Sequence, residues 1–247
     1  MGELALLAAA GTGTALATGL GAVPVFALGA RADALRPLLW GLAAGVMVIA
    51  SVVGLLAPAL DEGSGAAVAA GLLAGVLFLL LGRRALERRD VHVGALDGAG
   101  VRRSVLVFGV LLVHSLPEGF AIGTAFASER AGLGLFVLVA IAVQNIPEGT
   151  ASAIPMREAG FTASQQFWAA VVSSAPQPVG AVVAFLLVEQ IEGLLPVSFA
   201  FAAGAMLALV VLELVPQAFT RRTWRMALAG AAAGAALMLA LSAMIGV

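Results

Sequence analysis

The sequences His114-Ser115-Leu116-Pro117-Glu118 and Gln144-Asn145-Ile146-Pro147-Glu148 decide how this chain is organised. A glycine follows each pentad, so both share the pattern polar-polar-Leu/Ile-Pro-Glu-Gly. Hydrophobic residues precede each pentad, from Val105 to Val113 and from Leu133 to Val143. A carboxylate inside a hydrophobic segment is energetically costly, and ionisable residues within a membrane mark functional sites. The repeated pattern therefore predicts a site shared by two neighbouring helices.

The composition is that of a polytopic membrane protein. Of the 247 residues, 62% are hydrophobic and 11% are charged, and the mean hydropathy is +1.08. A soluble domain has about a quarter charged residues. The chain has no cysteine, which excludes disulfides and thiolate metal ligands, and its net charge of -1 gives no indication of nucleic-acid binding. The N-terminus lacks the basic start of a signal peptide, so we expect the first apolar segment to be retained.

Eight apolar segments are long enough to cross a bilayer, which takes about 20 residues. They are expected at approximately 5–29, 37–60, 66–86, 103–127, 132–156, 166–188, 194–217 and 224–246. Backbone polar groups in lipid must be satisfied within the segment, and the runs are continuously apolar, so we expect helices. The predicted fold is an all-α membrane protein with eight transmembrane helices, forming one domain over residues 1–247.

The arginines predict the orientation of these helices. All thirteen basic residues are arginines, and twelve of them follow the first, third, fifth and seventh segments. The opposite loops contain only Arg130, together with acidic residues. Cytoplasmic loops carry the positive excess, so the Arg-rich loops are predicted to be cytoplasmic and both termini external. The longest cytoplasmic loop, 87–103, contains Asp90, His92 and Asp97; we expect it to be solvated, with a transient cation contact as the alternative.

The two pentads carry the residues of a metal site. His114 and Glu118 are four residues apart and so lie on one helix face, and Gln144 and Glu148 repeat this arrangement. The proline of each pentad cannot donate a backbone hydrogen bond, which leaves a carbonyl oxygen free beside the polar face. One imidazole, two carboxylates and amide oxygens suit zinc, and the harder oxygen ligands also admit manganese or iron. We therefore predict a divalent-metal site near the middle of the membrane.

Polar and small residues in three other segments have separate interpretations. Glu213 follows an apolar run and lies about 12 Å along the helix from Arg221, which favours a place on the metal pathway. In the sixth segment, Gln177 lies between two prolines that distort the helix and free carbonyls. Glycines and threonines in the first segment favour close helix packing. Since no basic residue is expected near the three glutamates, a metal or protons must compensate their charge.

These features resemble the ZIP (Zrt-/Irt-like) family of divalent-metal transporters, particularly its bacterial members. The resemblance covers essentially the whole chain and rests on the two pentads and on Glu213 in Leu-Glu-Leu-Val-Pro. It implies a ZIP-like bundle in the cell inner membrane that moves zinc or a similar divalent cation, such as cadmium, iron or manganese, towards the cytoplasm. It implies no enzymatic activity, no catalytic cofactor and no nucleic-acid partner, and a homodimer is compatible with it.

The resemblance also assigns site residues. The primary metal ligands would be His114, Glu118, Gln144 and Glu148. A neighbouring position would be flanked by Ser115, Asn145 and Glu213, and the outer entrance would be lined by Met47 and Ser51. The chain departs from the family pattern where Gln144 replaces a histidine, Ser115 an asparagine, and Asn145 the aspartate of some two-metal members. The first departure weakens a preference for zinc, and the other two argue against a second metal. Three carboxylates against the four charges of two metals predict one tightly held ion.

An intramembrane metal-dependent hydrolase is the alternative from a different class. Such an enzyme needs an activated water and a general base at an open metal position. The sequence has no His-Glu-x-x-His motif, and His114 is the sole histidine in a predicted membrane segment, which argues against this alternative. Uptake of metal by the reconstituted protein without any other substrate would separate the two functions.

Overall fold

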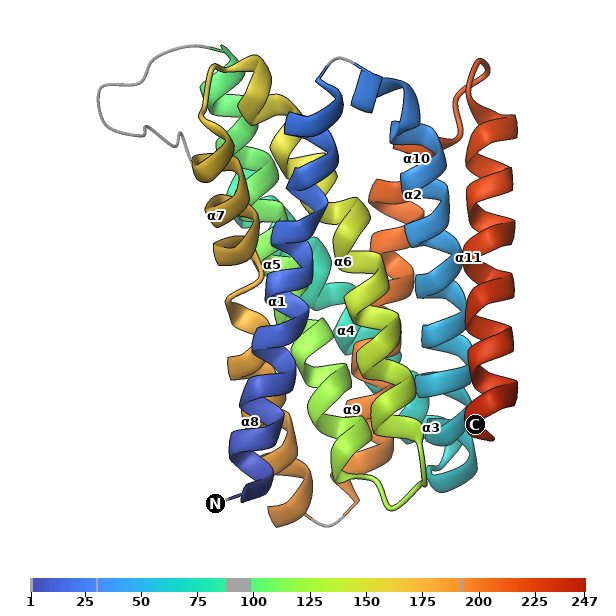
Figure 1. The fold of residues 1–247 in the computed structure, drawn as a ribbon. Helices are drawn as coiled ribbons and strands as arrows, with labels where there is room; N and C mark the ends of the chain where they lie inside the picture. The colour runs from blue at the N-terminus through green and yellow to red at the C-terminus, as the bar shows by residue number, and fades with distance from the viewer. Residues whose placement is uncertain (1, 30, 88–98, 192) are drawn as a thin grey trace.

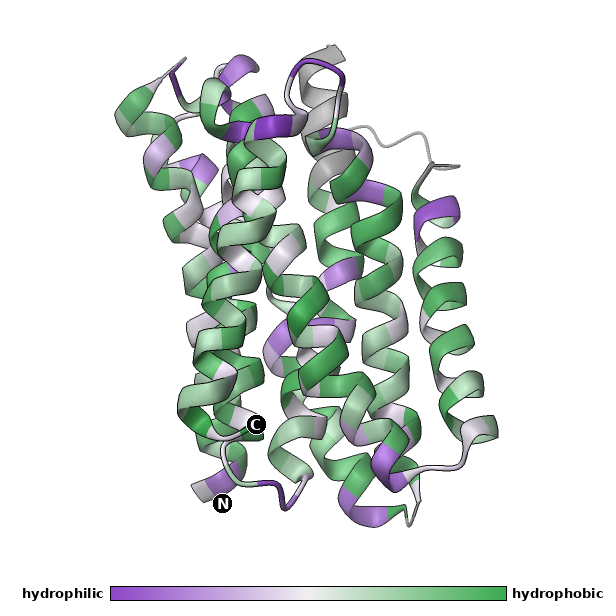
Figure 2. Cartoon of the chain, turned by 90° about the vertical axis from the view of Figure 1, so that its right-hand side faces the viewer, coloured by the Kyte–Doolittle hydropathy of each residue, from purple (hydrophilic) through white to green (hydrophobic). Residues whose placement is uncertain are grey.

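The computed structural model describes the chain apart from residues 1, 30, 88–98 and 192. Within the described part, eight helical spans are long and apolar enough to cross a membrane, as predicted. They stand side by side in one bundle, with the N- and C-termini at the same end (Figure 1). Hydrophobic residues cover the middle of the bundle, and hydrophilic residues gather mainly at its two ends (Figure 2). The all-α membrane fold is therefore confirmed.

Five of the spans are single helices and three are interrupted. The single helices are α1 (Gly2–Leu28), α4 (Gly65–Glu87), α5 (Ala99–Ala127), α6 (Leu133–Glu158) and α11 (Trp224–Ile245). The second span comprises α2 (Arg31–Ile49), the π-helix η1 (Ala50–Leu56) and α3 (Ala57–Glu62). The sixth comprises α7 (Ala163–Ser173) and α8 (Pro176–Gln190), and the seventh comprises α9 (Leu194–Leu209), the π-helix η2 (Val210–Leu214) and α10 (Val215–Ala218).

Two predicted boundaries differ from the structure. The second span begins at Arg31 and not at residue 37, because Pro37 is accommodated inside α2. The loop predicted at 87–103 is shorter, because α5 begins at Ala99. The residues proposed for a transient cation contact in that loop, Asp90, His92 and Asp97, lie outside the described residues.

Each π-helix precedes a proline by a few residues. Pro58 and Pro216 have no N–H, so the carbonyls of Gly54 and Leu212 lack an α-helical donor. The backbone shifts by one residue instead: Ala57 donates to the carbonyl of Val52, and the equivalent bond joins Val215 to Val210. Such π-helical turns are frequent at functional sites. The η2 turn contains Glu213, so this irregularity lies beside a predicted site residue.

Glycines let the helices approach closely in four pairs: α1 with α6, α5 with α8, α2 with α11, and α4 with α9. A methyl group on Gly149 of α6 would lie 1.7 Å from the carbonyl oxygen of Thr18 on α1. A methyl group on Gly119 of α5 would lie 2.3 Å from the carbonyl oxygen of Gln177 on α8. Small residues permit such backbone contact between membrane helices. The predicted packing role of the glycines in the first segment is confirmed for Gly11, Gly19 and Gly21, whereas a methyl group on Gly13 would have no neighbour within 4 Å. Helices α1, α5, α6 and α8 form one tightly packed group.

Arg130 is the one arginine in the loops that are predicted to lie on the same side of the membrane as the termini. It lies in the turn between α5 and α6, where its Nε is 2.8 Å from Glu62 Oε1 and its Nη2 is 3.1 Å from Asp61 Oδ2. Hydrogen bonding to Glu62, with a further contribution from Asp61, raises the pKa of Arg130. The two acidic residues at the end of α3 thus outweigh the single positive charge, which preserves the charge asymmetry that predicts the orientation.

Candidate metal centre

The four predicted primary ligands meet inside the bundle. His114 and Glu118 come from α5 and Gln144 and Glu148 from α6, and none of them is more than 5% exposed. Gln144 Nε2 donates to Glu118 Oε1 at 2.7 Å, which joins the two helices directly. His114 lines one small pocket together with Glu118 and the larger cavity together with Glu148. The matching spacing of the pentads therefore places imidazole, amide and carboxylate groups side by side.

Two acceptor atoms in this cluster have no donor. Gln144 Oε1 and Glu148 Oε1 are both buried and make no hydrogen bond in the structure. A buried acceptor without a partner costs about 1–3 kcal/mol. Within the described ranges, no three His, Asp or Glu side chains already surround a common point at metal-ligand distances. The cluster thus supplies unsatisfied oxygens that a cation would compensate after a modest side-chain rearrangement.

Glu118 is held from its other side by α8. Its Oε2 atom accepts a hydrogen bond of 2.6 Å from Gln177 Nε2. Gln177 Oε1 in turn accepts from Thr14 Oγ1 at 2.7 Å and from Asn145 Nδ2 at 3.1 Å. The sequence reasoning did not place Gln177 or Thr14 at the site. The available signal was an uncharged polar side chain, flanked by two prolines, within an otherwise apolar segment.

Asn145 and Ser115, which were predicted to flank a second metal position, form hydrogen bonds to backbone carbonyl oxygens. Asn145 Nδ2 also donates to the carbonyl oxygen of Thr14 at 2.7 Å. Ser115 Oγ lies 2.9 Å from the carbonyl oxygen of Leu111 and 3.0 Å from that of Ser173. The latter carbonyl is available because the sixth span breaks between α7 and α8, as its prolines predicted. Asn145 and Ser115 therefore fasten α5 and α6 to their neighbours.

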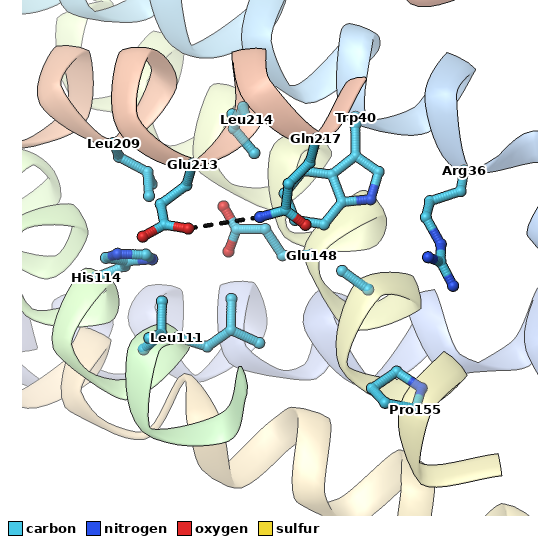
Figure 3. A pocket seen from close by; sticks show the side chains of 12 residues that line it. Arg36, Trp40, Leu111, His114, Glu148, Pro155, Leu209, Glu213, Leu214 and Gln217 are labelled. Carbon is cyan, nitrogen blue, oxygen red and sulfur yellow. Dashed lines mark hydrogen bonds between the residues drawn. The ribbon is translucent and has the colours of Figure 1, made fainter. Parts of the chain in front are cut away.

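A cavity of about 170 Å³ leads away from the primary residues (Figure 3). His114, Glu148 and Glu213 converge at one end of it, and Trp40 and Arg36 line the other end. The remaining lining residues are Val110, Leu111, Ala151, Pro155, Leu209, Leu214 and Gln217. Arg36 belongs to the first predicted cytoplasmic loop and lies near the start of α2. The cavity therefore runs from two of the predicted ligands, His114 and Glu148, towards the Arg-rich end of the bundle.

Glu213 has a basic neighbour. Arg83 Nη1 of α4 lies 2.8 Å from Glu213 Oε1, and the two side chains are 36% and 16% exposed. The expectation that no basic residue lies near the three glutamates is therefore wrong for Glu213. It failed because Arg83 is far from Glu213 in sequence, and helix packing brings the last turns of α4 beside η2. Glu118 and Glu148 form no ion pair with arginine among the described residues.

The structure is closed on the side of the termini. Met47 of α2 and Ser51 of η1, the residues assigned to the outer entrance, are fully buried and do not line the cavity. Met47 packs in one hydrophobic core with Leu55 and Phe136. The Ser51 hydroxyl is buried without a hydrogen-bond partner. The cavity described here therefore opens towards the Arg-rich end, and the two residues assigned to the outer entrance lie outside it.

Comparison with known proteins agrees with this architecture. A sequence model of the ZIP zinc transporter family matches residues 85–242. The chain is 34% identical over 93% of its length to zinc transporter GufA of Myxococcus xanthus, covering 95% of that protein. It is 35% identical over 93% of its length to zinc transporter ZIPB of Bordetella bronchiseptica, covering 78% of that protein. It is also 38% identical over 92% of its length to a putative zinc transporter of Arabidopsis thaliana, of which it spans only 37%.

The described part of the chain forms an eight-helix membrane bundle with buried carboxylates beside a cavity, and the relatives found by comparison are named zinc transporters. The chain belongs to the ZIP family of metal-ion transporters, as the bacterial-type resemblance in its sequence indicated. The alternative of an intramembrane hydrolase has no support, because the relatives are zinc transporters. The protein is therefore a multi-pass membrane transporter.

Proposed function

We propose that this protein carries zinc, or a similar divalent cation such as cadmium, iron or manganese, across the cell inner membrane into the cytoplasm. The observation that carries the proposal is the pair of buried, unpaired acceptors Gln144 Oε1 and Glu148 Oε1, since the Glu148 side chain also lines the cavity together with His114. A divalent cation satisfies both oxygens and neutralises the adjoining carboxylates. The names of the bacterial relatives support zinc as the substrate.

The primary site in this proposal consists of His114, Glu118, Gln144 and Glu148. The imidazole supplies the nitrogen ligand, and the carboxylates supply charge and hard oxygens. Binding competes with the hydrogen bond from Gln144 Nε2 to Glu118 Oε1, so the Gln144 amide would have to turn for its free oxygen to bind. In the metal-free protein, this hydrogen bond holds the Gln144 and Glu118 side chains in place and keeps the empty site from collapsing. When the metal leaves, the same hydrogen bond re-forms, so the Glu118 carboxylate is not left without a partner.

The exit route follows the cavity. From the primary site a cation reaches Glu213 and then Gln217, whose Nε2 lies 3.5 Å from Glu213 Oε2. The route continues past Trp40 to Arg36, and we assign that end to the cytoplasm because the arginine-rich loops surround it. Entry from the outside requires a second conformation in which Met47 and Ser51 are exposed, since both are buried here.

The test is uptake by the purified protein in proteoliposomes. Zinc should accumulate without any added organic substrate, and cadmium, manganese and iron should compete according to their affinity for the mixed nitrogen and oxygen site. A His114→Ala variant removes the nitrogen ligand and should raise the zinc concentration needed for half-maximal uptake strongly. Unchanged zinc affinity in this variant would show that the site lies elsewhere.

A further inference from the structure

Gln177 occupies a place at the site that the motifs on α5 and α6 do not account for. It lies in the first turn of α8, directly after the break in the sixth span, and its side chain is fully buried. Its Nε2 donates to Glu118 Oε2 at 2.6 Å and to Asn145 Oδ1 at 3.3 Å. Its Oε1 accepts from Thr14 Oγ1 at 2.7 Å and from Asn145 Nδ2 at 3.1 Å. The single proton of the Thr14 hydroxyl is shared with the carbonyl oxygen of Gly11 at 2.8 Å, so both donors of the Gln177 amide are used and its oxygen is satisfied mainly by Asn145.

Only one orientation of this amide fits its surroundings. Asn145 Nδ2 donates to the carbonyl oxygen of Thr14 at 2.7 Å, so the backbone of α1 fixes which end of Asn145 carries the nitrogen. If Gln177 were turned around, its nitrogen would face the nitrogen of Asn145 and its oxygen would face the Glu118 carboxylate. Both contacts are repulsive, so the Gln177 N–H group must point at Glu118.

This N–H group lies where a second cation would need acceptors. A second metal beside the primary one would share the carboxylate of Glu118 and use Asn145 as a flanking ligand. Glu118 Oε2 and Asn145 Oδ1 instead both face the amide nitrogen of Gln177. A donor with its partial positive charge repels a metal ion from that position. It also satisfies the two oxygens without adding net charge to a low-dielectric interior.

We propose that Gln177 is a positioning residue that limits the centre to one metal, because its amide nitrogen takes the place of a second cation between Glu118 and Asn145. The inference rests on the proposed function, since it concerns the same centre. The earlier argument for one metal compared the three carboxylates with the four charges of two metals. This inference instead names one neutral side chain, outside the two pentads, whose replacement changes the number of metals bound.

Gln177→Glu tests the proposal with an almost isosteric change. It replaces the N–H donor by an oxygen facing Glu118. Two carboxylate oxygens so close together need either a shared proton or a metal ion to compensate them, and cadmium in excess competes with the proton. Equilibrium dialysis of the purified protein against cadmium should give one bound equivalent for the unmodified chain and two for Gln177→Glu. The matched control is Gln166→Glu, a buried glutamine on α7 that donates to the carbonyl oxygen of Phe161, which should remain at one equivalent.

The outcomes separate this inference from the proposed function. Two equivalents in the unmodified protein, or one in a well-folded Gln177→Glu, would overturn the role of Gln177 and leave transport through the primary site intact. No bound cadmium in the unmodified protein would contradict the proposed function itself. If Gln177→Glu is not recovered as a monodisperse protein, the double variant Gln177→Ala/Asn145→Asp removes the amide nitrogen and adds a carboxylate at the same position from α6, and it should bind two equivalents. A single equivalent in that variant would equally overturn the inference.

Discussion

Arg83 Nη1 lies 2.8 Å from Glu213 Oε1, so a guanidinium at the end of α4 compensates the carboxylate that η2 places in the cavity wall. Any cation that leaves the primary site past Glu213 must compete with this fixed positive charge. Both partners are partly exposed, and ion pairs of this kind contribute about 1 kcal/mol or less. The contact is thus weak enough for a metal to displace it, and strong enough to keep the carboxylate from retaining the metal.

Replacing the Arg83 guanidinium should make metal bind more tightly at Glu213. Arg83→Gln removes the competing charge, so metal should bind at Glu213 up to about fivefold more tightly, the equivalent of about 1 kcal/mol. Conduction requires sites that a metal can leave. Initial rates of zinc uptake should therefore show a lower maximal rate at a lower half-saturating concentration. Arg84→Gln makes the same change in charge on the adjacent residue and is the matched control; equal effects of both variants would mean that Glu213 is not involved.

Both carboxylates of the primary site are expected to be essential for transport. Glu118→Ala and Glu148→Ala each remove one negative charge and one ligand from a buried site, and zinc uptake should fall to the level of empty liposomes. Glu189→Ala removes an exposed carboxylate near the end of α8 and should transport normally. The readout is uptake normalised to reconstituted protein. Substantial transport by either Glu118→Ala or Glu148→Ala would remove that residue from the ligand set.

The orientation can be tested with cysteines, because the chain contains none. Ser64 and Ser164 are both exposed and lie at opposite ends of the bundle, so Ser64→Cys and Ser164→Cys are nearly isosteric reporters. In intact spheroplasts an impermeant thiol reagent should label Ser64→Cys and leave Ser164→Cys unmodified until the membrane is opened. The reverse labelling pattern would invert the proposed direction of the cavity.

The one-sided cavity predicts unequal access to two further positions. Gln217 is exposed and lines the cavity, whereas Met47 is fully buried on the opposite side of the site. In metal-free inside-out vesicles, Gln217→Cys should react quickly with a thiol reagent, and its modification should block the release of zinc preloaded into the vesicles. Met47→Cys should react much more slowly under the same conditions. Comparable rates at the two positions would show that the conformation described here is not the dominant one.

Much of this structure could be predicted from the sequence, because membrane helices and the paired pentads have local signatures. The eight spans followed from hydropathy, and the meeting of His114 with Glu148 followed from matching positions in two adjacent helices. The contacts of Gln177 with Glu118 and of Arg83 with Glu213 could not be predicted in the same way. Each joins residues far apart in the chain, and each depends on how the sixth span breaks or how α4 packs beside η2. Residue spacing within one helix carries no information about such contacts.

The backbone contact between α1 and α6 links the metal site to helix spacing. Gly149 meets the carbonyl oxygen of Thr18, and a few residues away the carbonyl oxygen of Thr14 fixes Asn145. A substitution that moves α1 away from α6 would loosen the amide network that orients Glu118. This holds even for a substitution on the lipid-facing side. Variants of these small residues would then differ in how well they discriminate between metals of different radius. Residues on the lipid-facing surface of the bundle would thus change ion selectivity without contacting the ion.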